Sequence, residues 1–164
     1  MKRNQNTNGL TIVEILVAIA IVAILAAGLY SVGNYVETQS KIKLTESTIE
    51  TLVTALDEYH DFYGKFPDPN ADSEYLTGCD LSVEKLYYKL GLAPGAKKIL
   101  GHINTSLIKD ANSDGFREVV DAWGTDFGYD YKTSYNFPVI TSAGPDRDFG
   151  VTDPNNAQDN ITSR

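Results

Sequence analysis

Residues 10–30, LTIVEILVAIAIVAILAAGLY, are apolar except for one charged residue, Glu14. As a helix, these 21 residues would rise about 32 Å, which is enough to cross the hydrocarbon core of a bilayer. The polar leader before them has only nine residues, and the apolar run is longer than that of a cleavable secretory signal. Because Lys2 and Arg3 precede the run, it predicts a single membrane span with a cytoplasmic N-terminus.

Glu14 needs an explanation, because a carboxylate inside hydrocarbon is costly and usually has a partner. One interpretation is that Glu14 lies shallow enough to reach the membrane interface. The other concerns assembly. If the chain were cut after Gly9, the new amine of Leu10 would lie one helical turn from Glu14, and the amine of a neighbouring copy could neutralise the carboxylate. This spacing favours self-assembly.

The stretch from Gly9 to Ala18, GLTIVEILVA, together with Lys2 and Arg3, resembles the prepilin leader of type IV pilins and type II secretion pseudopilins. The resemblance implies that a prepilin peptidase cuts after Gly9, that Leu10 is N-methylated and that Glu14 acts in assembly. It also implies a subunit that is held in the inner membrane, surrounded by lipid, with a periplasmic head. From there it would assemble into a periplasmic homopolymer with other pseudopilins and inner-membrane secretion components.

A second helical pattern continues beyond the span, because apolar residues recur there at three- and four-residue intervals or their multiples. No proline occurs between residues 10 and 66, so the span and this stripe predict one long helix that Gly64 and Pro67 end. Gly28 and Gly33 are the places where it could bend. The residues of the stripe are Val36, Ile42, Ile49, Leu52, Val53, Leu56, Tyr59 and Tyr63.

The rest of the chain predicts a small α+β head. Residues 67–109 combine turn formers with a short helical element and form a variable connection, whereas short β-like runs after Lys109 predict a small antiparallel sheet. Two of these segments, EYHDFYGKFP and DAWGTDFGYDY, resemble the major pseudopilins, which implies a pilin-like fold. The predicted divisions are a leader (1–9), a membrane and filament-core helix (10–30), its amphipathic continuation (31–66), the connection (67–109) and a β-rich head with an acidic loop (110–164).

The composition excludes several classes of function. The formal net charge is −8 and the sequence pI is about 4.6, so a nucleic-acid partner, which needs a concentrated basic surface, is not expected. One cysteine, Cys79, cannot form an internal disulfide. Neither histidine, and no serine or cysteine, lies in a recognisable catalytic motif, so no enzymatic activity is expected.

The acidic C-terminal loop, ITSAGPDRDFGVTDPNNAQDNI, is a candidate calcium site. Calcium takes six to eight oxygens from carboxylates, carbonyls and water, which such a loop can supply. The loop resembles the calcium-binding loop of major pseudopilins, and on that basis Asp146 and Asp159 are the favoured ligands, with Asp148 and Asp153 as alternatives. The competing interpretation is a solvated acidic tail.

A second acidic loop, DANSDGFREVVD, is a weaker metal candidate. Its residues Asp110, Asn112 and Asp114 have the spacing of calcium ligands in an EF-hand, and Asp121 stands at the twelfth place. An EF-hand requires a helix on each side, whereas residues 117–123 predict a strand. A turn held by asparagine and aspartate side chains explains the same letters and is favoured.

These features predict a structural subunit of a type II secretion pseudopilus that supports protein export across the outer membrane. Two alternatives remain open. One is a type IV pilin for adhesion or motility, although many of those close their C-terminal region with a disulfide. The other is a signal-anchored extracytoplasmic binding protein that does not polymerise, with the acidic loops as its ligand site.

Overall fold

The computed structural model describes residues 11–68, 82–110, 113, 115–132, 134, 136–151 and 153–163. The chain divides into two compact units, which we call the N-terminal unit (Met1–Gln39) and the head unit (Ser40–Arg164). The predicted leader, residues 1–9, and Leu10 lie outside the described residues.

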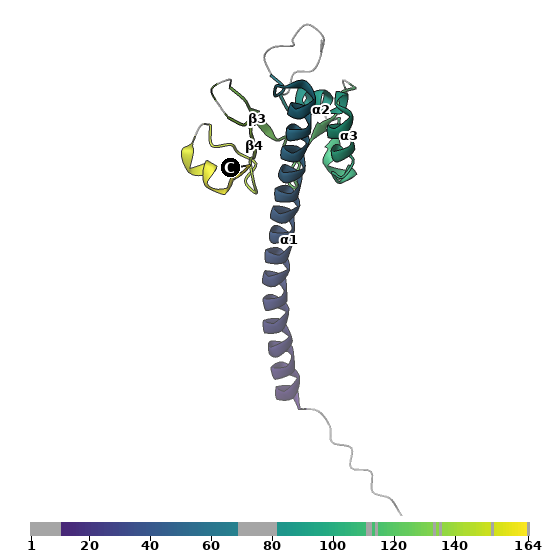
Figure 1. Ribbon diagram of the computed structural model, residues 1–164. Helices are drawn as coiled ribbons and strands as arrows, with labels where there is room; N and C mark the ends of the chain where they lie inside the picture. The colour runs from purple at the N-terminus through teal and green to yellow at the C-terminus, as the bar shows by residue number, and fades with distance from the viewer. Residues whose placement is uncertain are drawn as a thin grey trace, which may run out of the picture. The chain divides into compact units, whose positions relative to one another are not determined.

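The dominant element is α1, a 52-residue helix that runs from Ile12 to Tyr63 (Figure 1). It continues through Gly28 and Gly33, and no proline interrupts it. Gly64 ends it: this glycine adopts φ 70°, and its N–H donates to the carbonyl of His60 at 2.7 Å. The long helix is thus confirmed, although it stops three residues before the predicted limit of residue 66, because the left-handed residue breaks the pattern there.

The N-terminal unit contains a stretch of α1 that is long and apolar enough to cross a membrane, and none of that stretch is buried within the chain. A soluble core helix would have its apolar side chains covered by the rest of its own domain. The exposed apolar side chains of this unit are Ile12, Val13, Ile15, Leu16, Val17, Ile19, Ile21, Val22, Ile24, Leu25, Val32, Tyr35 and Val36.

In the head unit, α1 supplies one wall of the hydrophobic core. Ile49, Leu52, Leu56 and Tyr59 of the predicted stripe are buried, and so is Ala55, which the stripe did not include. At the end of the helix, Tyr63 of the stripe is 42% exposed. The predicted amphipathic face is therefore correct in the middle of this segment and uncovered at its end.

The connection adds two helices to this core. Helix α2 (Ser82–Leu92) buries Val83, Leu86 and Leu90, and α3 (Pro94–Leu100) buries Ala96 and Leu100. A short 3-10 turn, η1 (Thr105–Leu107), follows. Residues 82–109 are therefore part of the core as well as a connection between elements.

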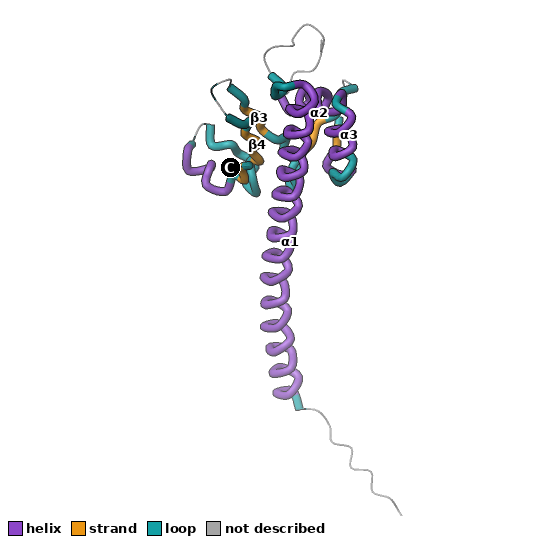
Figure 2. Tube along the Cα trace, in the orientation of Figure 1, coloured by secondary structure: helices purple, strands orange, loops and turns teal. Residues whose placement is uncertain are grey.

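Five short strands form two antiparallel sheets rather than the single sheet that the sequence predicts (Figure 2). In the first sheet, β1 (Ile108–Lys109) pairs with β2 (Glu118–Val119). In the second, β4 (Val139–Ser142) lies between β3 (Gly128–Asp130) and β5 (Ile161–Thr162). Between the two sheets lies a tight turn after β2, described below, and an isolated antiparallel pairing of Val120 with Asp126 flanks it.

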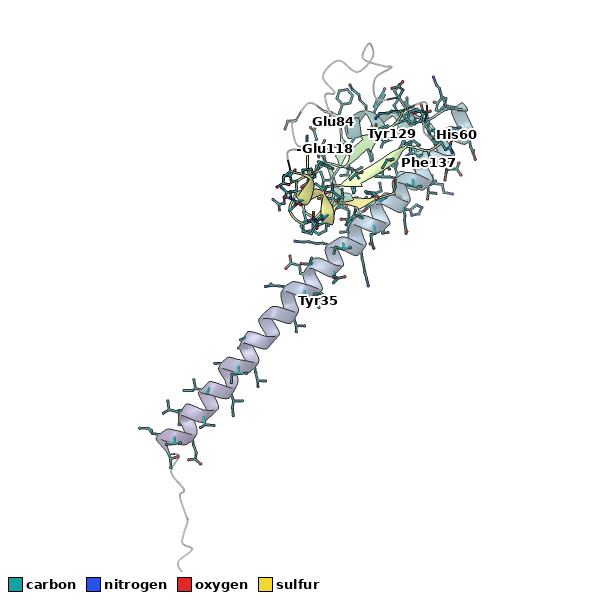
Figure 3. All side chains as sticks on the ribbon, turned by 90° about the vertical axis from the view of Figure 1, so that its left-hand side faces the viewer. Tyr35, His60, Glu84, Glu118, Tyr129 and Phe137 are labelled. Atoms are coloured by element: carbon teal, nitrogen blue, oxygen red, sulfur yellow. The ribbon has the colours of Figure 1, made fainter. Side chains whose placement is uncertain are left out.

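Phe66 packs the end of α1 against the second sheet. Its ring stacks on His60 at 4.5 Å between centroids and meets Phe137 edge-on at 4.9 Å. His60 and Phe137 are labelled in Figure 3. Nearby, the Tyr129 hydroxyl donates to the carbonyl of Pro67 at 2.7 Å. The result is the predicted α+β, pilin-like arrangement, in which a long N-terminal helix packs against small antiparallel sheets.

Candidate assembly and cation sites

The start of α1 is a capping box formed by Thr11 and Glu14. The backbone N–H and the hydroxyl of Thr11 both donate to Glu14 Oε2 at 2.8 Å, and the Glu14 N–H donates to Thr11 Oγ1 at 3.3 Å. These bonds satisfy backbone donors that the first turn of a helix leaves open. This role was not predicted from the sequence, although the pattern Thr-x-x-Glu before an apolar run is its standard signal.

Glu14 lies on the first turn of α1, and residues 15–30 that follow it carry no charge. Gly9 and Leu10, the predicted cleavage and methylation residues, lie outside the described residues. The helix also carries small residues that would let a neighbouring helix approach closely. They are Ala18, Ala20, Ala23, Ala26 and Ala27.

Asp121 organises the turn after β2. Its Oδ1 accepts hydrogen bonds from the N–H groups of Trp123 and Thr125, each at 2.9 Å, and its Oδ2 accepts one from the Ser142 hydroxyl at 2.7 Å. The Ala122 N–H donates to Thr45 Oγ1 of α1 at 3.2 Å. A strand was predicted over residues 117–123, but β2 ends at Val119 and the D-A-W-G segment is a turn, because the carboxylate gathers its N–H groups.

The C-terminal loop, described at residues 144–151 and 153–159, is held together by its own aspartates. Asp148 N–H donates to Asp146 Oδ1 at 2.8 Å, and Gly150 N–H donates to Asp148 Oδ1 at 2.9 Å. Asp153 accepts the Asn155 N–H at 3.0 Å and thereby caps the 3-10 helix η2 (Pro154–Asp159). The Asn156 amide and the Gly150 N–H hold the pKa of Asp148 below its usual value. These bonds are typical of turns in which aspartate binds nearby backbone.

Two predicted calcium ligands of this loop lie together. The Asp146 N–H donates to Asp159 Oδ2 at 3.3 Å. Gly144, at φ 73°, packs so closely on Asp159 that a Cβ there would collide with its carbonyl. Asp148 and Asp153 use their carboxylates on other parts of the loop.

The side chains of the loop supply only part of the ligand set that calcium needs. Among the residues that the structure describes, no three acidic, histidine or cysteine side chains are grouped to hold a metal ion. Asp146 and Asp159 suit calcium as oxygen donors, and backbone carbonyls and water would have to complete its six to eight ligands.

Of the three predicted metal ligands in the second acidic loop, one lies within the described residues. Asp110 Oδ2 accepts the Gly115 N–H at 3.2 Å, while Asn112 and Asp114 lie outside the described residues. Asp121 does not serve this loop, because its carboxylate binds Trp123, Thr125 and Ser142 as described above. The Asp110 contact is of the kind expected for the favoured turn, and a cation site at Asp110, Asn112 and Asp114 stays a prediction.

Two buried glutamates were not anticipated. Glu84 of α2 and Glu118 of β2 are fully buried on neighbouring elements of the head unit (Figure 3). Asp126 lies near Glu118; its pKa is raised by desolvation and then by the charges of Glu118 and Asp121, while Lys109 acts in the opposite direction. The apolar spacing of their segments gave no sign of these buried acids.

Comparison with known families identifies the N-terminal segment. Residues 4–30 match the family described as the prokaryotic N-terminal methylation motif, and this range includes Gly9, Leu10 and Glu14. No curated protein and no solved structure matches the chain.

The motif, the long helix and the small sheets define a type IV pilin-like protein. The motif implies processing by a prepilin peptidase and pilus-like assembly, and with the apolar helix it indicates a prepilin anchored in the inner membrane. Proteins of this class are generally structural rather than enzymatic. The motif is common to pilins and pseudopilins.

Proposed function

We propose that the protein is the repeating subunit of a type II secretion pseudopilus. The observation that carries this proposal is the N-terminal unit: a methylation motif leads directly into an apolar helix whose side chains the chain itself leaves uncovered. Lipid covers such a helix before assembly, and copies of the same helix cover it in the filament. The subunit is thus stored in the membrane and used in a polymer.

Cleavage after Gly9 leaves a free amine on Leu10, one turn from Glu14. In lipid the carboxylate has only the local donors of Thr11, whereas in a filament the amine of a neighbouring subunit neutralises it. Alanines along the helix permit the close approach that this pairing requires. Assembly is therefore favoured because it pairs the Glu14 carboxylate, which is costly in the membrane, with an amine of opposite charge.

Two features of the chain support secretion over adhesion or motility. A single cysteine excludes the internal disulfide that closes the C-terminal region of many type IV pilins. The head also resembles the major pseudopilins in its helix end and in the D-A-W-G segment. A filament that works within the periplasm has less need of a disulfide-stabilised outer surface.

We also propose that calcium binds the C-terminal loop through Asp146 and Asp159. Their proximity to each other and to the backbone of Gly144 supports the proposal. A bound cation would offset the repulsion between the aspartates of the loop and stabilise its fold outside the cytoplasm.

The experiment that tests the main proposal begins with the processed protein from membranes of its native cells. Intact mass and N-terminal sequencing are expected to show a chain that begins at methylated Leu10. Deleting the gene is expected to leave exported proteins in the periplasm, while any surface pili remain. A chain that begins at Met1, or normal export with loss of surface pili, would overturn the proposal.

A further inference from the structure

The head unit contains an apolar cavity that neither the motif nor the cation loops explain. It has a volume of about 480 Å³ and lies against α2, α3 and the first sheet. Tyr88 and Phe116 form one wall, with their rings edge to face at 6.0 Å between centroids, and Leu92, 50% exposed, lies beside them. The cavity is therefore an open, partly aromatic site.

The charge of this cavity is opposite to that of the protein. Lys97 of α3 and Arg117, which precedes β2, both line it and are exposed, and no acidic residue of the described chain does so. The whole chain has a net charge of −8. A basic, apolar cavity on an acidic protein favours an occupant that combines negative charge with an exposed apolar side chain.

The C-terminal loop has that combination. It carries Asp146, Asp148, Asp153 and Asp159 against a single cation, Arg147. Between the aspartates, Val151 is 87% exposed and is the most exposed large apolar side chain in the described part of the chain. The loop therefore offers an apolar knob surrounded by carboxylates.

The cavity and the loop lie on opposite sides of the head unit. In Figure 1 the loop, in yellow, lies on the left of α1 and helix α3 lies on its right. One molecule cannot close this contact on itself, so the partner must be another copy. Contacts between two different surfaces of identical subunits are heterologous, and they generate an open helical filament when the rotation between subunits does not close into a ring.

We infer that the acidic loop of one subunit docks into this cavity of the next, with Val151 between Tyr88 and Leu92 and with Asp148 and Asp153 facing Lys97 and Arg117. The inference rests on the proposed polymerisation. It adds a contact between the head units of neighbouring subunits to the contact between their N-terminal helices. It gives the filament a direction, because each subunit donates a loop and receives one.

Cysteine crosslinking of the full chain in membranes of its native cells tests this contact. Cys79 is first replaced by serine, so that only introduced cysteines react. Thr105 lines the cavity and is exposed, and Val151 is the docking residue. The pair Thr105→Cys and Val151→Cys is expected to give a ladder of disulfide-linked oligomers on mild oxidation. Thr54→Cys with Val151→Cys is the matched control and should give none, because Thr54 is on α1, outside the cavity.

Filaments are scored in the same cells by electron microscopy after the outer membrane is opened to release the periplasmic contents. A ladder from the Thr105 and Val151 pair supports the docking contact. A ladder without filaments would support the docking contact and contradict the proposed pseudopilus. Filaments without a ladder overturn the docking contact and leave the proposed function intact. The absence of both the ladder and the filaments overturns the docking contact and the proposed function. Crosslinked dimers from Val151→Cys alone would show a symmetric contact and also overturn it.

A charge exchange provides a second, independent test. Arg117→Glu is expected to lower filament yield about tenfold, because it places a carboxylate opposite the acidic loop. Adding Asp153→Lys to that variant should restore most of the yield. Lys98→Glu is the control, since Lys98 neighbours Lys97 on α3 and does not line the cavity. Equal losses from Arg117→Glu and Lys98→Glu, or no restoration by Asp153→Lys, would contradict the contact.

Discussion

Thr11 and Glu14 bind each other reciprocally at the first turn of α1, with the hydroxyl and N–H of Thr11 donating to one oxygen of Glu14. The same carboxylate is the group proposed to pair with a neighbouring Leu10 amine. The capping box therefore holds Glu14 in place before assembly, and it supplies donors to the carboxylate while the subunit is surrounded by lipid. A mutation of Glu14 changes both roles at once, so the two must be separated.

Glu14→Ala is expected to abolish filaments and to leave membrane insertion intact. Loss of the carboxylate removes the partner of the Leu10 amine of a neighbouring subunit, whereas membrane insertion depends on the apolar length of the span. The measurements are the periplasmic filaments released when the outer membrane is opened and the membrane-bound fraction of the protein. Normal filaments from this variant would contradict the pairing.

Two further variants distinguish charge from capping. Glu14→Gln keeps the capping box, because glutamine also reaches back to the N-cap N–H, but it cannot form an ion pair. It should therefore fail to assemble as Glu14→Ala does. Thr11→Ala keeps the carboxylate and loses the hydroxyl cap, so it should assemble at reduced yield. If Glu14→Gln assembled normally and Thr11→Ala did not, capping would be the main role of Glu14.

Asp121→Ala is expected to destabilise the head unit by about 3 kcal/mol or more, because it leaves the Trp123 and Thr125 N–H groups and the Ser142 hydroxyl without their buried acceptor. The measurement is urea unfolding of a soluble fragment beginning at Val32, which retains the core of the head unit. Ser142→Ala, which removes one of these three bonds, should cost about 1 kcal/mol. Equal stability of the Asp121→Ala fragment and the parent would refute this role.

Local patterns allowed the long helix to be predicted. The uninterrupted apolar run, the absence of proline and Gly64 specify α1 and its end, because these signals act within a few residues of one another. The same holds for the β-rich character of the chain after Lys109. The division into two sheets was not predictable, because it depends on how Asp121 closes a turn in three dimensions.

Long-range contacts escaped the sequence analysis for a similar reason. The bond from the Tyr129 hydroxyl to the Pro67 carbonyl joins residues 62 positions apart, and burial raises the pKa of this tyrosine. No spacing rule connects such residues. Glu84 and Glu118 likewise occupy positions in short apolar segments where surface placement was the simpler expectation. The cavity, too, is built from separate elements, α2, α3, η1 and β1.

Asp126→Asn is expected to stabilise the head unit at neutral pH. Desolvation and the nearby carboxylates raise the pKa of Asp126, so the folded state holds its proton more tightly than the unfolded state. The ionised group therefore opposes folding above its folded pKa, and this penalty disappears as the pH falls below the unfolded value. The gain at pH 7 should be about 0.5 kcal/mol or less, because the side chain is partly solvated and screened.

The measurement for Asp126 is urea unfolding of the same fragment between about pH 4 and pH 7, where the advantage of Asp126→Asn should shrink as the pH falls. Lys109→Ala is the complementary variant, because the Lys109 charge favours ionised Asp126. It should lower stability at neutral pH in the parent and have less effect in Asp126→Asn. An advantage that grows toward low pH would show that the sign is wrong.

Removing calcium tests the proposed cation site in the C-terminal loop. If calcium binds only the folded loop, a concentration 100 times its Kd adds about 2.7 kcal/mol to the free energy of unfolding. A chelator should therefore lower the melting temperature of the fragment, and added calcium should restore it. Asp146→Ala and Asp159→Ala should each abolish the response to calcium. Asn155→Ala leaves the carboxylates in place, so this variant should still respond to calcium. A melting temperature that chelator leaves unchanged would refute bound calcium, and the contacts among the aspartates and backbone would then be sufficient to fold the loop.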